Sequence, residues 1–307
     1  MNKSKNDLVV KDNALINASY NLDLVEQRLV LLAIVEARES QKGINAETEL
    51  TVNVSSYINH FNVEKHTAYE MLKQACEALF HRQFSYQFFN ESQNPEYVRS
   101  RWVSKITYVD NEAVIRVVFA PDVIPLITRL EERFTSYELK QVAKLTSRYS
   151  LRLYELLIAW RSRGKTRIYQ IAEFRQQLGV EENLYNRTEA FKRRVLDAAV
   201  EQINEHTDIL VKYEQHKAGR SITGFSFKFK QKKVDNSLIQ KNTIKKLTNK
   251  QIIFFAEKLA HHSDFASKYS KVGESYEEFA IRLEKELNTP QKVEFYSSYL
   301  EKVGFKP

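Results

Sequence analysis

The amino-acid sequence predicts an α+β fold in which two tandem winged-helix domains precede a small helical appendix. Within residues 150–230 the predicted elements follow the order helix, strand, helix, helix, strand, strand, which is typical of a winged helix. Residues 22–119 repeat this order with different side chains. We place the first domain at residues 1–134, the second at residues 135–233 and the appendix at residues 234–307.

The long helix predicted for residues 191–209 identifies the second domain. Its apolar residues recur at every fourth position and therefore form one stripe along the helix. The stripe consists of Phe191, Val195, Ala199 and Ile203. A helix, a short strand and a shorter helix precede it, and two strands joined by a turn at Gly219 follow it. In chain order, these flanking elements are predicted at residues 150–162, 168–170, 171–180, 209–214 and 222–230.

The first domain has the same plan, displaced by 117 positions along the sequence. The matching apolar pairs are Tyr57 with Phe174, Phe61 with Leu178, and Val63 with Val180. Its helices are expected at residues 22–38, from Val54 onward, and along a stripe of Tyr69, Leu72, Cys76 and Leu79. Its strands are expected at residues 50–52, 84–89, 98–108 and 114–119, with turns at Asn94-Pro95 and Asp110-Asn111.

The appendix is expected to begin with a basic linker and to continue as three helices. The linker is marked by Lys241, Lys245, Lys246 and Lys250. Two capping-box pairs, Thr248 with Gln251 and Ser275 with Glu278, predict the starts of two amphipathic helices. Thr289 and Pro290 supply a cap and a first-turn proline for a third helix. This helix carries Val293, Tyr296 and Leu300.

Positive charge is concentrated in the second domain. The 307-residue chain has a formal net charge of +8. Counting Lys and Arg against Asp and Glu gives −3 for residues 1–134, +9 for residues 135–233 and +2 for residues 234–307. Such an uneven distribution indicates a polyanionic partner, and the simpler alternative is a basic surface that only aids solubility.

Composition also predicts the compartment. The longest apolar run, residues 29–35, is far shorter than the ~20 residues that cross a bilayer, and no apolar signal segment lies near the amino terminus. The single cysteine, Cys76, permits neither an internal disulfide nor a cysteine-based zinc site, and we expect it to be inert core packing. We therefore expect a cytoplasmic protein that spans no membrane and needs no cofactor or metal.

Several segments together resemble the iteron-binding replication initiators (Rep proteins) of theta-replicating plasmids. They are VVKDNALINASYNLDLVEQRLVLLAI, LTSRYSLRLYELLIAW, IAEFRQQLGV and FKRRVLDAAVEQINEHTDI, and the resemblance covers about residues 8–233. It implies two winged helices that bind direct repeats at a plasmid origin, melt adjacent A·T-rich DNA and recruit the host initiator and helicase. It also implies a dimer, formed through the first domain, that represses its own gene while monomers initiate replication.

Basic residues at the amino end of the long helix are the main candidates for DNA contacts. Arginine reads guanine in a bidentate manner, and Lys192 and Arg193 lie off the apolar stripe. Because consecutive residues differ by ~100° around a helix, Lys192, Arg193 and Arg194 cannot all face one groove. We favour Lys192 and Arg193 there and assign Arg194 to a phosphate or an internal carboxylate. The groove-facing set is Arg187, Thr188, Lys192 and Arg193, and the wing adds Lys217, Arg220, Lys228 and Lys230. The alternative is a solvated charged face, with Arg220 in a surface turn.

The first domain offers a weaker set of basic residues. Its second helix begins with Lys65, His66 and Thr67 and carries Lys73 two turns later, so we expect phosphate positioning more than base reading. Arg99, Arg101 and Lys105 alternate with Ser100, Trp102 and Ser104 along one predicted strand. This second basic face is as suited to a dimer partner as to DNA.

Catalytic readings find little support in the sequence. Gly164, Lys165 and Thr166 imitate the end of a phosphate-binding loop, but Ala159 stands where a glycine is required and a helix precedes the triplet. A rolling-circle nuclease would need two histidines separated by one apolar residue, and no such pair exists. The carboxylates form no metal-binding pattern. We therefore expect a protein that acts by binding, not an enzyme.

Two other functions remain open from the residues alone. A transcriptional regulator with tandem winged helices would use the same DNA contacts without any role in replication. A nicking enzyme would show metal-dependent cleavage of supercoiled origin DNA. Direct repeats beside an A·T-rich tract near the encoding gene would favour the initiator, whereas an inverted repeat alone would favour a repressor.

Overall fold

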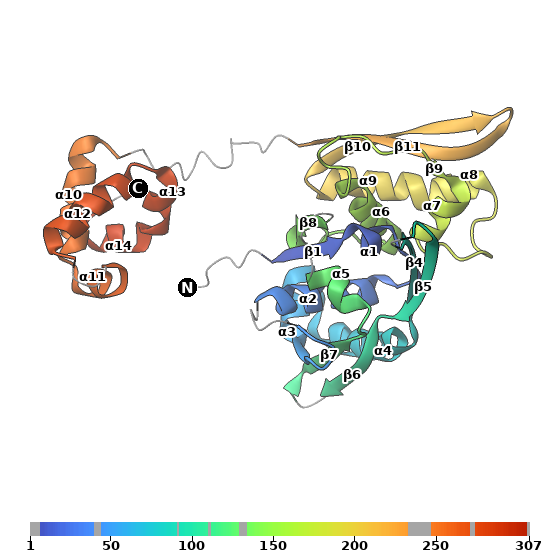
Figure 1. Cartoon of the computed structure of the whole chain (residues 1–307), viewed down its shortest axis with the longest axis horizontal. Coiled ribbons are helices and arrows are strands. Elements are labelled where there is room, and N and C mark those ends of the chain that lie inside the picture. Colours follow the sequence, from blue (N-terminus) through green and yellow to red (C-terminus); the bar gives the residue numbers. More distant parts are fainter. Residues whose placement is uncertain are drawn as a thin grey trace. The chain divides into compact units, whose positions relative to one another are not determined.

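The computed structural model describes residues 7–39, 44–90, 92–109, 112–128, 134–232, 247–270 and 274–305. The chain divides into two compact units, Met1–Lys232 and Lys233–Pro307. The first unit contains two winged helices, and every regular element described in the second unit is a helix (Figure 1). This confirms the α+β fold with a helical appendix. The domain boundaries expected at residues 134 and 233 remain predictions.

The first winged helix follows the predicted element order. Its helices are α2 (Leu24–Glu39), α3 (Val54–Phe61), α4 (Lys65–His81) and α5 (Val123–Thr128). Its strands are β2 (Ser19–Tyr20), β3 (Leu50–Asn53), β4 (Gln83–Phe89), β5 (Pro95–Arg101), β6 (Val103–Val109) and β7 (Val114–Phe119). Strands β3, β7 and β6 form one antiparallel sheet in that order, and β2, β4 and β5 form another. Helices α2 and α4 pack on each other and on the first of these sheets.

The second winged helix repeats this plan. Its elements are α6 (Arg148–Ile158), β9 (Tyr169–Gln170), α7 (Ile171–Gln177), α8 (Thr188–Phe191), α9 (Ala198–His206), β10 (Ile209–Ala218) and β11 (Ser221–Gln231). Strand β11 lies between β10 and β9 in an antiparallel sheet. The β10–β11 hairpin is longer than predicted. Gly219 turns it with a φ of +62°, a left-handed conformation that glycine adopts without steric cost.

A π turn, Lys192–Asp197, joins α8 to α9, so that residues 188–206 form one continuous helix, which we call the recognition helix. It begins and ends three residues earlier than the helix predicted for residues 191–209. The apolar stripe is confirmed, since each of its four side chains is at most 1% exposed. The stripe therefore fixes which side of the recognition helix faces the core.

The single strand predicted over residues 98–108 is instead two strands, β5 and β6, in different sheets. The break falls at Trp102, which is fully buried. Its ring packs edge-on against Tyr20 at 4.9 Å and lies 5.0 Å from the ring of Phe84. The buried indole anchors the point at which the chain leaves one sheet and enters the other, and alternation in the sequence did not indicate this crossing.

The second unit consists of α10 (Asn249–Ala260), α11 (Ser263–Tyr269), α12 (Tyr276–Leu287), α13 (Pro290–Phe295) and α14 (Ser297–Lys302). Both predicted capping boxes are present at the starts of α10 and α12. The third predicted helix is two short helices that break at Tyr296, and α11 was not predicted.

Lys250 was wrongly placed in the linker, because the Thr248 cap already starts α10 and Lys250 lies in its first turn. The other three lysines of the predicted linker lie outside the described residues, as do Asp110 and Asn111 of a predicted turn. The second unit has its own core, formed by apolar side chains of all five helices and of the residues flanking them.

A direct joint links the two winged helices of the first unit. Strand β1 (Leu8–Asp12), which precedes the first winged helix, pairs antiparallel with β8 (Phe134–Glu138), which leads into the second. One hydrophobic cluster of buried side chains runs through both domains. The two domains therefore form one body, and a cut at residue 134 would fall at the start of β8.

The carboxylate of Glu155, on α6, lies at the centre of this joint. Its Oε1 accepts hydrogen bonds from the Lys11 ammonium of β1 and from the Tyr137 hydroxyl of β8, each at 2.7 Å, and its Oε2 accepts one from Arg152 at 2.7 Å. We call these four residues the interdomain cluster; each is at most 2% exposed. Burial alone would raise the pKa of the Glu155 carboxyl, but the charges of Lys11 and Arg152, with the hydrogen bonds from Lys11 and Tyr137, outweigh it and lower the pKa to about 2.

Arg152 extends the interdomain cluster to the backbone. Its guanidinium donates to the carbonyl of Ile16 at 2.9 Å, in the short helix α1 (Asn13–Asn17), and to that of Ala18 at 3.0 Å, between α1 and β2. It also lies 4.0 Å from the centre of the Tyr20 ring and donates to the Gln177 carbonyl at 3.1 Å. The hydrogen bonds to Ile16 and Ala18 therefore join the two domains, and those to Glu155 and Gln177 hold the guanidinium in place within the second domain.

Replacing Glu155 with Gln should destabilise the first unit strongly. The substitution keeps the shape but leaves Lys11 and Arg152 buried without a counter-charge, which typically costs about 3–5 kcal/mol. Urea unfolding of the full chain measures this cost. Glu201→Gln, which neutralises an exposed carboxylate on α9, is the matched control and should change the unfolding free energy by less than about 0.5 kcal/mol. A loss of similar size in both variants would contradict the role given to Glu155.

The cost of Glu155→Gln should also depend on pH. A carboxyl whose pKa is lowered by folding contributes stability above its unfolded pKa of roughly 4.3, and loses it as the pH falls toward the folded value. The difference in unfolding free energy between wild type and variant should therefore be constant near neutral pH and shrink below about pH 4. A difference that stays constant down to pH 2.5 would mean that folding does not lower the pKa of the Glu155 carboxyl.

Candidate nucleic-acid interface

The amino end of the recognition helix presents a basic group to solvent. Arg187, Arg193 and Arg194 are exposed, Lys192 is half-buried, and none of the four makes an ion pair with another described residue. Thr188 begins the helix. Arg194 has no internal carboxylate partner in the described chain, which leaves a phosphate as its expected contact. The amino end of a helix also attracts anions through its free N–H groups and its dipole. We call these five residues the basic head.

Arg175 of α7, which was not among the predicted residues, holds the loop that leads into the recognition helix. Its guanidinium donates to the carbonyls of Leu184 at 2.6 Å and Tyr185 at 2.9 Å, and lies 5.3 Å from the centre of the Phe191 ring. Tyr185 has a φ of +53°, so the loop makes a tight turn there. Arg175 therefore fixes where Arg187 leaves the loop. Its partners are backbone carbonyls, for which the sequence gives no signal.

The wing places its aromatic residues as predicted. Phe225, Phe227 and Phe229 are at most 9% exposed and face the recognition helix, and the rings of Phe225 and Phe191 lie 6.1 Å apart. Because side chains alternate along a strand, Lys228 and Lys230 point to the outer face of the sheet, away from the recognition helix.

The tip of the wing carries two further predicted residues. Lys217 and Arg220 lie on either side of the Gly219 turn, both are exposed, and neither forms an ion pair with the described residues. Lys228, by contrast, is paired with Glu214 at 2.7 Å on the outer face. The predicted wing residues thus fall into two separate groups.

In the first domain, α4 occupies the place of the recognition helix. Lys65, His66 and Thr67 form its exposed first turn, and they have no side-chain partner among the described residues. Lys73 lies two turns later, with its ammonium 5.9 Å from the centre of the Tyr108 ring. This smaller group corresponds in position to the basic head, and its role in DNA binding stays a prediction.

The second basic face predicted in the first domain is not one strand. Arg99 and Arg101 are exposed on β5, where Arg101 donates to the Phe80 carbonyl at 2.9 Å. Lys105 lies on β6, in the other sheet, and pairs with Glu49 at 2.6 Å. The crossing at Trp102 separates them, so only the two arginines share a strand.

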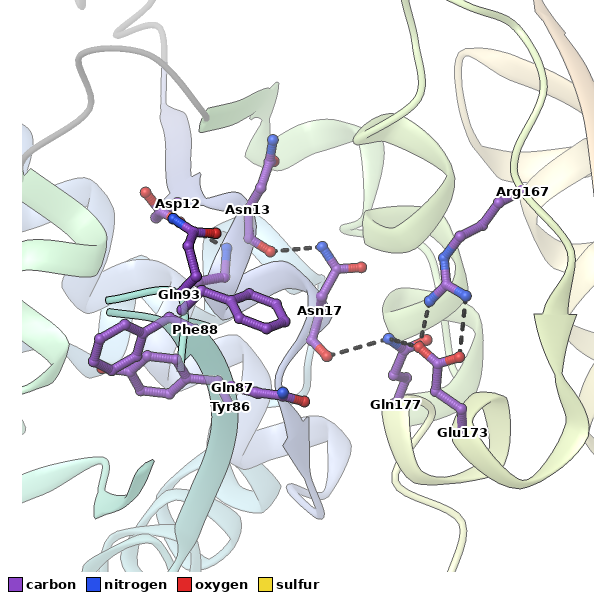
Figure 2. Close-up of a pocket in the computed structure, with 12 residues that line it drawn as sticks. Asp12, Asn13, Asn17, Tyr86, Gln87, Phe88, Gln93, Arg167, Glu173 and Gln177 are labelled. Atoms are coloured by element: carbon purple, nitrogen blue, oxygen red, sulfur yellow. Dashed lines mark hydrogen bonds and ion pairs between the residues drawn. The ribbon is translucent and has the colours of Figure 1, made fainter. Parts of the chain in front are cut away.

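A cleft of about 760 Å³ lies between the β4–β5 hairpin of the first domain and α7 of the second (Figure 2). Arg167 and Glu173 form an ion pair on one wall, Phe88 lies on the other, and Phe89 also lines the cleft. Gln177 donates to Glu173 at 3.2 Å and to the Asn17 carbonyl at 3.3 Å. The sequence did not predict this cleft, because its walls are distant segments that meet only through the joint between the domains.

Gly164, Lys165 and Thr166 do not form a phosphate-binding loop. They run along the edge of β11, where the Gly164 carbonyl accepts from the Phe229 N–H at 2.8 Å and the Thr166 N–H donates to the Phe227 carbonyl at 3.0 Å. Within the described residues, no group of three His, Cys, Asp or Glu side chains could hold a metal ion. No helix in the described part of the chain is long and apolar enough to cross a membrane.

Cys76, on α4, is buried in the core, as expected. Burial raises the pKa of its thiol to about 12, so that the reactive thiolate is not populated near neutral pH.

Taken together, the two winged helices and the basic head define a DNA-binding protein. Residues 8–158 match the family model described as initiator replication protein, WH1, and residues 170–229 match the model described as initiator Rep protein, WH2. These matches cover more than half of the chain. The chain therefore belongs to the family of initiator replication proteins, as its resemblance implied.

Three known proteins are similar to this chain. A replication initiation protein of Escherichia coli is 24% identical over 260 residues, which are 82% of this chain and 77% of that protein. The crystal structure of the Pi initiator protein in complex with iteron DNA covers 75% of this chain and 100% of its own, at 20% identity and a TM-score of 0.62, and so has the same fold. The WH1 domain of MSBI1.176, a replication protein isolated from a multiple sclerosis patient, is 66% identical across 40% of this chain and 93% of its own, at a TM-score of 0.34.

Replacing Arg193 with Ala should weaken binding to the cognate DNA by about 1–3 kcal/mol and relax the preference at one base position. Fluorescence anisotropy with the cognate duplex and its single-base variants measures both effects. Arg38→Ala removes an exposed arginine at the end of α2 and should leave cognate affinity nearly unchanged. If Arg193→Ala weakens cognate and random duplexes equally, Arg193 contacts a phosphate and not a base.

Proposed function

We propose that this replication initiator binds short direct repeats (iterons) at a plasmid origin, with the recognition helix in the major groove. The basic head carries this proposal. Its three arginines are exposed and unpaired among the described residues, on a helix whose other side is locked into the core. The Pi initiator, which shares the fold, is known in complex with iteron DNA. Arg187, Lys192 and Arg193 would read base edges, and Arg194 would contact a phosphate.

The first domain would place α4 on the same duplex. Lys65, His66 and Thr67 have the position in their domain that the basic head has in the second. Residues 1–134 carry a net charge of −3, so contacts there would position the protein through a few phosphates and add little sequence preference. Arg99 and Arg101, exposed on β5, would make further contacts with the phosphates of the DNA backbone. The second domain would therefore dominate the choice of sequence.

The arrangement of the two domains favours direct over inverted repeats. Both DNA-binding helices belong to one chain, and the shared core and the interdomain cluster hold them in one body. The two domains have different side chains, so a single chain offers no two-fold axis and would bind an asymmetric site. An array of such sites in one orientation would then be filled by identical monomers.

Binding to the array would promote opening of adjacent A·T-rich DNA and recruit the host initiator and the replicative helicase. We place this activity in the cytoplasm and attribute it to binding alone, without a cofactor or catalytic step. The second unit offers exposed apolar side chains for recruitment, with Ile253 and Phe254 on α10 and Ile281 on α12 about half exposed.

A dimer that represses the initiator's own gene would form through the first domain. Strand β5 is the free edge of its sheet, and Tyr97 on it is 78% exposed. Phe88 and Phe89 on β4 are 40% and 63% exposed, whereas Phe84 on the same strand and Trp102 after β5 are buried in the core. An unpaired edge with exposed aromatic side chains pairs readily with a second copy.

A footprint of the purified full chain on the DNA beside its own gene tests the proposed function. The expected result is a series of protected tracts of equal length, repeated in one orientation and next to an A·T-rich segment. The affinity should fall steeply with salt, because several phosphates are neutralised. Protection confined to one inverted repeat would instead indicate a repressor without a replication role.

Tyr97→Lys should weaken the dimer at least tenfold, which corresponds to about 1.4 kcal/mol or more. A lysine on an edge strand opposes pairing, and each dimer would contain two of them. Sedimentation equilibrium of the full chain measures the change. Tyr276→Lys replaces an aromatic residue of the second unit that is 58% exposed, and should leave the dimer intact. Equal effects, or none from Tyr97→Lys, would move the dimer contact away from β5.

A further inference from the structure

The outer face of the second wing carries a row of like charges. Lys212 on β10 lies directly opposite Lys228 on β11, and Lys165 lies opposite Lys228 on the other side. Residues directly opposite each other in an antiparallel sheet share one face, with Cβ atoms about 4.5–5.5 Å apart. Since Phe227 and Phe229 point inward, these lysines point outward, and all three are exposed. We call them the lysine row.

The lysine row is only partly neutralised. Glu214 pairs with Lys228 at 2.7 Å, whereas Lys165 and Lys212 make no ion pair with the described residues. Like charges placed directly opposite each other destabilise a sheet. A groove of about 590 Å³ lies beside the row and continues the basic face to Lys230. Repulsion among these lysines therefore lowers the stability of the sheet unless a bound anion neutralises them.

The row and the basic head face different directions. The recognition helix packs against the inner face of the sheet, where Phe225 meets Phe191. Phe225 is paired with Gln215 on β10, and Lys212 lies on the outer face three residues from Gln215 along that strand. At ~3.3 Å per residue, Lys212 is about 10 Å from Gln215. A duplex held by the basic head is therefore not positioned to cover the row.

The chemistry of the row favours nucleic acid over protein. Protein interfaces have apolar centres from which lysine is depleted. Among the residues that line the groove, Leu210 is the one large apolar side chain that is exposed. A lysine ammonium is a compact point charge that binds phosphates without demanding a fixed geometry. We propose that the lysine row binds the phosphate backbone of a second DNA duplex while the basic head holds the first. The initiator thereby tethers two DNA segments on opposite sides of one wing.

A two-duplex capture experiment tests this tethering. A duplex that bears the cognate repeat is immobilised and loaded with the full chain, and capture of a labelled duplex without the repeat is measured. The double variant Lys165→Gln, Lys212→Gln should bind the first duplex as wild type does, and should capture the second at least tenfold less at ~0.1 M salt, because two phosphate contacts are lost. Its thermal stability should not fall, since the substitutions relieve repulsion. The charge-preserving variant Lys165→Arg, Lys212→Arg should retain capture.

Lys250→Gln with Lys285→Gln is the matched control, because it removes the same charge from two exposed positions in the second unit. Undiminished capture of the second duplex by the Lys165→Gln, Lys212→Gln variant would overturn the proposal, and so would an equal decrease in the control. Undiminished capture is also the result expected if the lysine row binds an acidic protein and not DNA. The proposal rests on the proposed function only for the first duplex. If the wild-type chain does not bind the first duplex, both the proposed function and the tethering are overturned. A loss of capture by the wild-type chain that is confined to the second duplex would overturn the tethering alone.

Discussion

The buried carboxylate of Glu155 is the contact on which the arrangement of both winged helices depends. It joins Lys11 from the first strand of the chain to Arg152 and Tyr137 from the second domain, across sequence separations as large as 144 residues. A buried ion pair adds little net stability compared with apolar packing, but breaking one costs several kcal/mol. Its effect is therefore to exclude other arrangements of the two domains, while the shared hydrophobic core provides most of the stability.

Because the two domains form one rigid body, the DNA-binding surfaces of the first unit have fixed orientations relative to one another. The apolar stripe turns the basic head outward, Arg175 fixes the loop before it, and the alternation of β11 sends its lysines to the opposite face. The first turn of α4 belongs to the same body. Each surface can then meet DNA at a set angle, which is what an asymmetric site repeated in one orientation requires.

Local patterns in the sequence were sufficient to predict most of the fold and part of the candidate site. The four-residue stripe gave the buried side of the recognition helix, capping boxes gave the starts of α10 and α12, and alternation gave the inward and outward residues of β11. These features depend on neighbours within a few residues. The sheet crossing at Trp102, the β1–β8 pair, Arg175 and the interdomain cluster depend on partners brought together by the whole fold, often backbone carbonyls, and periodicity carries no information about them.

Insertion of five base pairs into a single cognate repeat tests the central claim most directly. A hydroxyl-radical footprint first locates the tract protected by each winged helix, and the insertion is placed between them. Five base pairs rotate one tract by about half a turn of the duplex. Because the interdomain cluster fixes the two domains in one body, the inserted site should lose protection of the first-domain tract and bind only as tightly as the second domain alone. Protection of both tracts at undiminished affinity would show that the domains move independently, and would contradict this account.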